Sequence, residues 1–472
     1  MAIWKWSAAD TARNIRDGNV SCVEVVESHL RRMDEINPRI NAVPVQLPEQ
    51  SLALARELDN KRSKLAELPP LYGVPVTTKI NMDLAGQANS DGVVAFKDNI
   101  ATQDAPVIAN LKQDGAIILG LTNTPEFSIR WFTSNELHGT SLNPWDPTVT
   151  PGGSSGAAAA AVAAGIGCIA HGNDMGGSLR HPAYCCGVAT IRPSFGRIAN
   201  GNPSAAGGRP PISQLLSVQG PIARSVADVR LGLAAMSRFS AFDADWSPAK
   251  DSGRAKKAPF RIAYQPDPFG EGISPAVQGA MEQAREALIA AGHRVEEVSL
   301  PDALQMSEIW GRLAMAEVAT MQQQELEQYG SSEVIRTVNA YRDFFGEPTL
   351  ASTMQDMAER NRIRRAWSLL LNEYDLVLMP VSAEQAFAND LDFTQPYQIA
   401  RILKAQRFLL MINALGLPAA GVPTGLHNGV PVGVQLVGAP LDDEICLQGA
   451  QAIEDHCGTL GESLWQHGFI AC

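Results

Sequence analysis

The sequence has no long hydrophobic run and no basic cluster. Its least polar stretch, residues 156–170, is rich in alanine and glycine and is too short to cross a bilayer of about 30 Å. Lys and Arg number 38 against 50 Asp and Glu, which gives a formal charge of −12. Binding to nucleic acid phosphates needs a strong basic patch, and basic residues occur only in scattered pairs such as Arg31-Arg32, so we expect no direct nucleic acid binding. Because the least polar stretch is short, we also expect no membrane insertion.

Paired-cysteine motifs are also missing. The 7 Cys residues include no CxxC spacing, and the adjacent Cys185 and Cys186 are poorly placed to bridge each other. The opening residues, Met-Ala-Ile-Trp-Lys-Trp-Ser, lack the apolar stretch of a secretory signal. We therefore expect a reduced, cytoplasmic protein whose 472 residues bury enough apolar surface to fold without disulfides or a structural metal.

The patterns that are present are typical of a layered α/β protein. The clearest unit covers residues 261–300: residues 261–264 predict a strand, Ser274 and Pro275 begin a helix, Gly292 ends it, and residues 294–300 predict a second strand. A strand–helix–strand unit of this length implies a parallel crossover. We expect a single domain over residues 1–472, with a helical N-terminal part at about 1–65 and a polar insertion or loop at about 239–259.

Three segments carry residues suited to catalysis. Residues 150–156, Thr-Pro-Gly-Gly-Ser-Ser-Gly, resemble a flexible linker, but a run of small apolar residues that favours a packed helix follows them. The segment also matches G-x-S-x-G, the nucleophile turn of α/β-hydrolases, with Ser154 as the nucleophile. Prolines at 144, 147 and 151 argue against the strand that this turn requires, and no histidine lies in a context that identifies it as a catalytic base.

The other two segments supply an anion site and a base. In residues 174–180, Asp-Met-Gly-Gly-Ser-Leu-Arg, two glycines before Ser178 allow successive backbone N–H groups to form an oxyanion hole, although a simple turn is the alternative. Lys79 follows an apolar run that predicts a buried strand. Burial disfavours an ammonium ion, so this lysine is a candidate for a neutral general base, against the alternative of an ordinary solvated lysine.

Together, these segments resemble the amidase signature family of serine hydrolases. The resemblance extends from about residue 5 to residue 455, and Ser154 and Ser178 lie 24 positions apart, as in that family. Five further segments match in order: residues 121–127, 143–146, 220–225, 415–418 and 433–438. The resemblance implies an α/β fold with a large mixed, mainly parallel central sheet covered by helices on both faces.

The resemblance also implies a catalytic apparatus. Ser178 would be the nucleophile, Ser154 the bridging serine after a cis peptide bond, and Lys79 the base. The backbone N–H groups of Met175, Gly176, Gly177 and Ser178 would form the oxyanion hole, and Ser155 and Asp174 would support the network. The implied reaction cleaves the C–N bond of a small-molecule amide through an acyl-enzyme, with no cofactor and no metal.

Several points stay open at this level. The family commonly has an acidic residue directly after the lysine, where this sequence has Ile80, and a second glycine after the serine pair, where it has Ala157. Alternatives are the amidase subunit of a tRNA-dependent amidotransferase and a catalytically inert binding protein. The oligomeric state is open, with a homodimer as one option. Phe127 and Trp131 are candidates for the acyl pocket, with core packing as the alternative. Residues 306–327 and 354–371 predict helices that could cover the site.

Overall fold

The computed structural model describes residues 2–205, 207–248 and 258–471. Its strands are β1 (Val45–Gln46), β2 (Pro75–Lys79), β3 (Ile117–Thr122), β4 (Ser134–Asn135), β5 (Gly139–Thr140), β6 (Ile169–Asp174), β7 (Ala189–Arg192), β8 (Val218–Ala223), β9 (Arg261–Tyr264), β10 (Arg294–Glu297), β11 (Leu376–Pro380), β12 (Ala419–His427) and β13 (Val430–Val437).

The helices are α1 (Ala8–Asp17), α2 (Cys22–Ile40), α3 (Pro48–Arg62), α4 (Pro106–Gln113), α5 (Gly156–Ala163), α6 (Arg180–Cys186), α7 (Pro211–Leu216), α8 (Val226–Met236), α9 (Pro275–Ala290), α10 (Ala303–Glu317), α11 (Gln323–Tyr329), α12 (Ser332–Phe345), α13 (Leu350–Glu373), α14 (Leu391–Thr394), α15 (Ile399–Ala405), α16 (Arg407–Leu415), α17 (Asp443–Cys457) and α18 (Gly461–His467). Shorter helical turns are η1 (Ile3–Lys5), η2 (Val94–Phe96), η3 (Glu126–Ser128), η4 (Val318–Gln322) and η5 (Pro396–Gln398).

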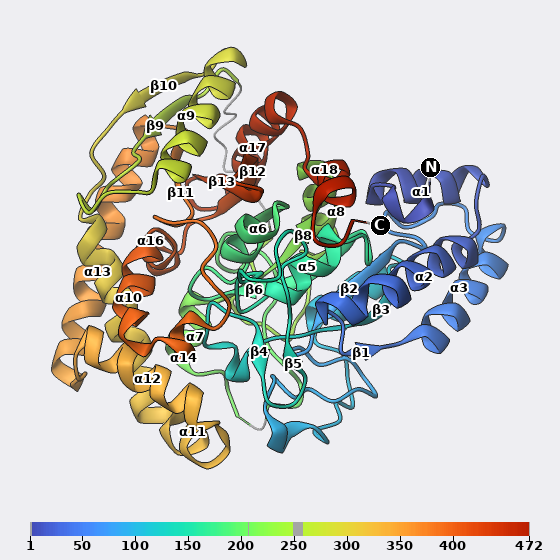
Figure 1. The fold of residues 1–472 in the computed structure, drawn as a ribbon, viewed down its shortest axis with the longest axis horizontal. Coiled ribbons are helices and arrows are strands. Elements are labelled where there is room, and N and C mark those ends of the chain that lie inside the picture. Colours follow the sequence, from blue (N-terminus) through green and yellow to red (C-terminus); the bar gives the residue numbers. More distant parts are fainter. Residues whose placement is uncertain (1, 206, 249–257, 472) are drawn as a thin grey trace.

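One 11-stranded sheet runs through the molecule in the order β1-β3-β2-β6-β8-β7-β12-β13-β11-β9-β10 (Figure 1). The predicted mixed sheet is confirmed, but its predicted mainly parallel character is wrong: four neighbouring pairs are parallel and six are antiparallel. The parallel pairs lie in two groups toward the edges. The centre is antiparallel partly because β12 and β13 form a hairpin, with the short turn Asn428-Gly429 between them.

Local sequence signals correspond to the observed elements. Ser21 and Glu24 form a capping box at the start of α2, and the Ser274 side chain caps α9. Strands β9 and β10 flank α9 and are parallel, as the strand–helix–strand pattern predicts. The predicted insertion at 239–259 falls partly on residues 249–257, which lie outside the described residues.

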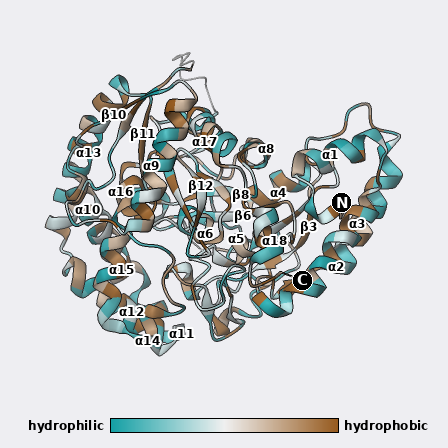
Figure 2. Cartoon of the chain, turned by 45° about the horizontal axis from the view of Figure 1, so that its top comes forward, coloured by the Kyte–Doolittle hydropathy of each residue, from teal (hydrophilic) through white to brown (hydrophobic). Residues whose placement is uncertain are grey.

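Helices cover both faces of the sheet. Helices α1–α3 lie beside the edge that contains β1, and α10 and α13 lie toward the opposite edge (Figure 1). Hydrophilic residues mark the outward sides of α2, α3 and α13 (Figure 2). By contrast, every residue of α5 is buried, because its alanines allow it to pack closely within the core. No helix in the described part of the chain has the length and apolar character needed to span a membrane.

The topology places the polar residues that end β2 and β6 at the same end of these two strands. Strands β2 and β6 are parallel neighbours, with Val76 opposite Ile169 and Thr77 opposite Ala170. Because parallel strands run in the same direction, Lys79 at the end of β2 and Asp174 at the end of β6 emerge on the same side. In open α/β sheets, ligands bind at the carboxyl ends of such strands.

Candidate active site

Lys79 ends strand β2, and its side chain is fully buried. Its Nζ donates hydrogen bonds to Ser154 Oγ at 2.6 Å and to Asn173 Oδ1 at 2.8 Å. Burial disfavours the ammonium form and lowers the pKa of Lys79 to about 7, although Asp91 and Asp174 oppose this shift. A substantial fraction of this lysine is therefore neutral near pH 7 and able to accept a proton.

Ser154 is held by the glycine-rich segment that precedes α5. The Gly153–Ser154 peptide bond is cis, as the family resemblance implies. A Cβ on Gly153 would lie 2.4 Å from the backbone nitrogen of Phe132, so a larger residue does not fit there. The residues before Ser154 form irregular chain instead of a strand, which contradicts the α/β-hydrolase alternative. The side chain that donates a hydrogen bond to Ser154 Oγ is Lys79, and no histidine of the described residues does so.

Ser178 lies between β6 and α6, with 9% of its surface exposed. Its hydroxyl lines the same cavity as Ser154, and no hydrogen bond joins the two serines among the described contacts. The backbone N–H groups of Met175, Gly176 and Ser178 donate to no residue that the structure describes. The N–H of Gly177, however, donates to Asp174 Oδ1 at 2.8 Å. The predicted oxyanion hole therefore has three candidate donors instead of four, because the Gly177 N–H already binds a carboxylate.

Two tryptophans fix the orientation of this turn. Trp310 Nε1 donates to the carbonyl oxygen of Met175 at 2.7 Å, and Trp131 Nε1 donates to that of Gly176 at 2.8 Å. In a trans peptide unit the N–H group points opposite to the C=O group. The indole that binds the Met175 carbonyl therefore directs the Gly176 N–H away from Trp310.

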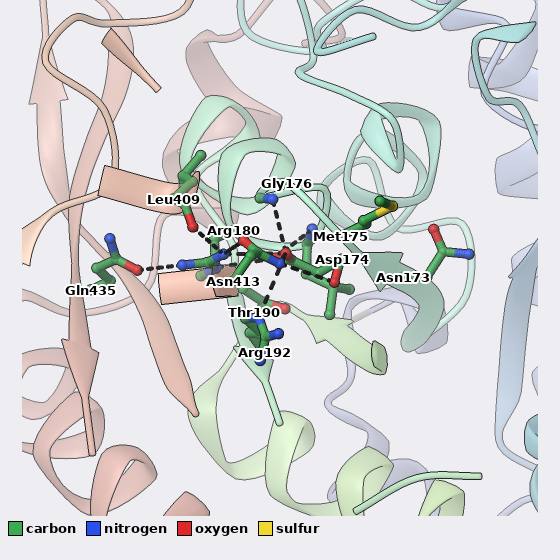
Figure 3. Close-up of polar contacts among 12 residues, drawn as sticks. Asn173, Asp174, Met175, Gly176, Arg180, Thr190, Arg192, Leu409, Asn413 and Gln435 are labelled. Atoms are coloured by element: carbon green, nitrogen blue, oxygen red, sulfur yellow. Dashed lines mark hydrogen bonds and ion pairs between the residues drawn. The ribbon is translucent and has the colours of Figure 1, made fainter. Parts of the chain in front are cut away.

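A buried ionic network around Asp174 holds the turn before Ser178 in place. Asp174 accepts hydrogen bonds from Arg180 Nε at 3.0 Å and from Asn413 Nδ2 at 2.7 Å, and Arg192 Nε lies 3.9 Å from it. Figure 3 shows Arg180 and Asn413 converging on Asp174, while the Asn173 side chain points away. Burial alone raises the pKa of Asp174, but Arg180, Arg192 and Asn413 outweigh burial and hold this pKa well below its usual range. Asp174 is therefore ionised.

Replacing Asp174 by Asn should lower the free energy of unfolding by about 3–5 kcal/mol, because two fully buried guanidinium groups lose their counter-charge. Urea unfolding measures this loss. Since the folded pKa lies below the unfolded value of about 3.9, Asp174 contributes stability above about pH 4 that is lost as the pH falls. The variant should lack this acid dependence.

Asp98→Asn, which removes an exposed carboxylate, is the matched control for Asp174→Asn and should change stability by no more than about 0.5 kcal/mol. A loss below about 1 kcal/mol in Asp174→Asn would contradict the anchoring role.

The serines open into a cavity of about 800 Å³. One wall is apolar and aromatic, and a more polar wall is formed by residues 200–203, 205, 207–210, 213, 214, 217 and 242–245. The apolar wall contains Phe127, Ile129, Trp131, Trp310, Met315, Val318, Val338 and Tyr341. An apolar cavity with a few polar groups is typical of a small-molecule site.

The structure tests several expectations about residues around the site. Phe127 and Trp131 both line the cavity, and both also pack in or against the apolar core. Of the two predicted covering helices, α10 contributes to the cavity wall and α13 does not. Ser155 Oγ donates a hydrogen bond to the backbone oxygen of Asn173 at 3.3 Å.

Sequence reasoning missed some of the polar groups of the site. Asn81, Asp91 and Asn173 line the cavity. The only signal for Asn81 and Asn173 was their position close to Lys79 and Asp174, and no signal pointed to Asp91. Among the described residues, no group of three or more His, Cys, Asp or Glu side chains is arranged to hold a metal ion.

Comparisons with known proteins agree with this geometry. A model of the amidase family matches residues 24–447. Indoleacetamide hydrolase of Bradyrhizobium diazoefficiens is 46% identical over 98% of this chain and 89% of its own length. A glutamyl-tRNA(Gln) amidotransferase subunit of Fusobacterium nucleatum is 30% identical over 95% of this chain and 97% of its own. A bacterial aryl acylamidase of the amidase signature family superimposes with a TM-score of 0.83 at 26% identity, covering 98% of both chains.

Proposed function

Because this chain belongs to the amidase family, we propose that Lys79, Ser154 and Ser178 carry out its hydrolysis of carboxylic acid amides. The reaction acts on C–N bonds other than peptide bonds, as in the related indoleacetamide hydrolase. The observation that carries the residue assignment is the 2.6 Å hydrogen bond between Lys79 Nζ and Ser154 Oγ, at a cavity that Ser178 also lines.

Proton transfer begins at the buried amine. Neutral Lys79 takes a proton from Ser154, Ser154 takes one from Ser178, and the Ser178 oxygen forms a bond to the amide carbonyl carbon. The relay requires the two serine hydroxyls to lie within hydrogen-bond distance in the reacting complex, and catalytic hydrogen bonds commonly shorten only in that complex.

Charge then develops on the carbonyl oxygen. The N–H groups of Met175, Gly176 and Ser178 are available to stabilise it, and such a donor contributes about 3–4 kcal/mol. The relay runs in reverse to protonate the leaving nitrogen, and the C–N bond breaks to give ammonia or an amine and a Ser178 acyl-enzyme. Water, deprotonated by the same relay, hydrolyses this ester and releases the carboxylate.

We assign the substrate to primary amides of arylacetic acids, with indole-3-acetamide as the first to test. Two observations support this choice. The related hydrolase is named for indoleacetamide, and the cavity has an aromatic wall beside the serines. Burial of an aryl group against such a wall favours its substrates over small aliphatic amides.

A panel of amides tests this assignment. Indole-3-acetamide, phenylacetamide, acetamide, glutamine and an anilide are supplied to the purified chain, and released ammonia or aniline is measured. We expect kcat/KM for indole-3-acetamide to exceed that for acetamide by about 100-fold or more. Ser178→Ala protein, prepared in the same way, serves as the blank for contaminating amidases. Equal turnover of acetamide would contradict the aryl assignment.

The amidotransferase alternative predicts a different result in that panel. A protein that works only within a complex would release no ammonia from simple amides on its own, or would act on glutamine alone. Ammonia release from indole-3-acetamide by the isolated chain would argue against this alternative.

A further inference from the structure

A directional chain of hydrogen bonds leads away from Lys79. Lys79 Nζ donates to Asn173 Oδ1 at 2.8 Å, and Asn173 Nδ2 donates to Asn81 Oδ1 at 3.0 Å. Asn81 Nδ2 then donates to Ser128 Oγ at 3.0 Å, and Ser128 Oγ donates to Asp91 Oδ1 at 2.6 Å. All four bonds have the donor on the lysine side, so their dipoles align between an amine at one end and a carboxylate at the other.

Asp91 is held in a defined position at the cavity wall. It is half-buried, it lines the cavity, and its backbone oxygen accepts a hydrogen bond from the Phe127 N–H at 3.0 Å. Its φ of 44° lies in the left-handed region, which Asp and Asn adopt more readily than other residues with side chains. The backbone therefore accepts Asn as well as Asp at this position, which makes a charge-only substitution available.

From this chain of contacts we propose that Asp91 is a positioning residue that supplies the counter-charge of Lys79 and keeps it basic enough to act as the general base. The inference rests on the proposed function, in which Lys79 is that base. The proposal also explains how the site can work without the acidic residue that the family commonly has directly after the lysine. Ile80 takes that position here, and it is an apolar side chain with 1% exposure and no charge.

The other charged groups near the pair do not take this role. Asp174 also faces Lys79, but its carboxylate is already paired with Arg180. His171 accepts a hydrogen bond from the backbone N–H of Lys79, and burial lowers the pKa of His171 to about 4, so it is neutral at pH 7.

Burial raises the pKa of Asp91 to about 7, and Glu325 of α11, on the far side, adds to this rise, whereas the Ser128 hydrogen bond and the charge of Lys79 oppose it. Asp91 therefore carries its negative charge above about pH 7. Asp91 forms no direct ion pair with a cation among the described residues, and Lys79 is the cation whose charge acts on it.

The sign of the effect follows from electrostatics. A nearby negative charge favours the ammonium form and raises the pKa of Lys79 against the lowering caused by burial. Without that charge the pKa falls, so the neutral amine appears at lower pH, but this amine is a weaker base. Asp91→Asn should therefore move the acid limb of the kcat/KM profile to lower pH and reduce the plateau above it.

The experiment compares pH profiles of kcat/KM for indole-3-acetamide, or for the best amide of the panel. In Asp91→Asn the midpoint of the acid limb should move to lower pH by about one unit. Ser128→Ala interrupts the hydrogen-bond chain but keeps the carboxylate, and it should shift the midpoint in the same direction by less. Asp98→Asn removes an exposed carboxylate from the same segment and should leave the profile unchanged.

An Asp91→Asn profile whose acid limb stays in place or moves to higher pH would overturn the proposal. Should that variant not fold, as judged by its thermal transition, an unshifted limb in Ser128→Ala would overturn it instead. Lys79→Met distinguishes a failure of the proposed base from a failure of the proposed role of Asp91. If Lys79→Met keeps wild-type turnover, the assignment of the base fails. If it is inactive while Asp91→Asn leaves the limb in place, only the counter-charge role fails.

Discussion

Ser178→Ala should abolish amide hydrolysis, with kcat falling by about 10⁴-fold or more while the protein remains folded. The nucleophilic oxygen forms the acyl bond, so no neighbouring group can replace it without a different mechanism. The substitution removes one oxygen atom that makes no hydrogen bond to a described residue, so the free energy of unfolding should change little. Ammonia release and thermal unfolding measure the two quantities.

A matched control for Ser178 is Ser237→Ala at the end of α8. Its hydroxyl donates to the Leu233 carbonyl oxygen, and it does not line the cavity, so this variant should keep wild-type kcat. Labelling with a fluorophosphonate adds a test that needs no substrate. Wild-type protein should be labelled at Ser178 and Ser178→Ala should not, whereas a catalytically inert binding protein would not react. Undiminished cleavage by Ser178→Ala would refute the assignment.

Lys79→Met should lower kcat/KM by about 10²- to 10⁴-fold, the range for loss of a general base. Methionine has a similar length and no amine, and it leaves no unpaired charge at this fully buried position. Asn173 Oδ1 and Ser154 Oγ lose a donor, which should cost stability by about 1–3 kcal/mol. Steady-state kinetics and urea unfolding give the two values.

Lys79→Arg is the informative companion to Lys79→Met. It keeps a cationic donor at this position but cannot release its proton within the accessible pH range. It should therefore be inactive at every pH at which it is folded. If the arginine variant regained most of the activity, the site would use position 79 only as a fixed charge, and the neutral-amine mechanism would be wrong.

The antiparallel centre of the sheet shows where local patterns stop being informative. The strand–helix–strand unit from β9 to β10 was predictable because caps and periodicity act within a few residues. The positions of β7, β8, β12 and β13 depend on pairing between strands far apart in the sequence. The resemblance implied a mainly parallel sheet, and only the pairing of these distant strands makes the middle of the sheet antiparallel.

The oxyanion turn gives a second example. Two glycines before Ser178 predicted a turn with free N–H groups, and those of Met175, Gly176 and Ser178 donate to no described residue. Whether each N–H is available depends on Asp174, which binds the Gly177 N–H, and on Asn413 from α16, which holds Asp174. No spacing rule reveals a partner more than two hundred positions away.

The sequence by itself determined the family and the reaction class, and the family resemblance singled out Lys79, Ser154 and Ser178 as the proposed catalytic residues, because family motifs are residue types at characteristic spacings. The tertiary structure alone decided that Lys79 is buried against Ser154 and Asn173, and that a hydrogen-bond chain joins it to Asp91. The physical reason is that the basicity of an amine depends on the solvent and charges around it. Those surroundings are assembled by strands and loops that meet only when the chain folds.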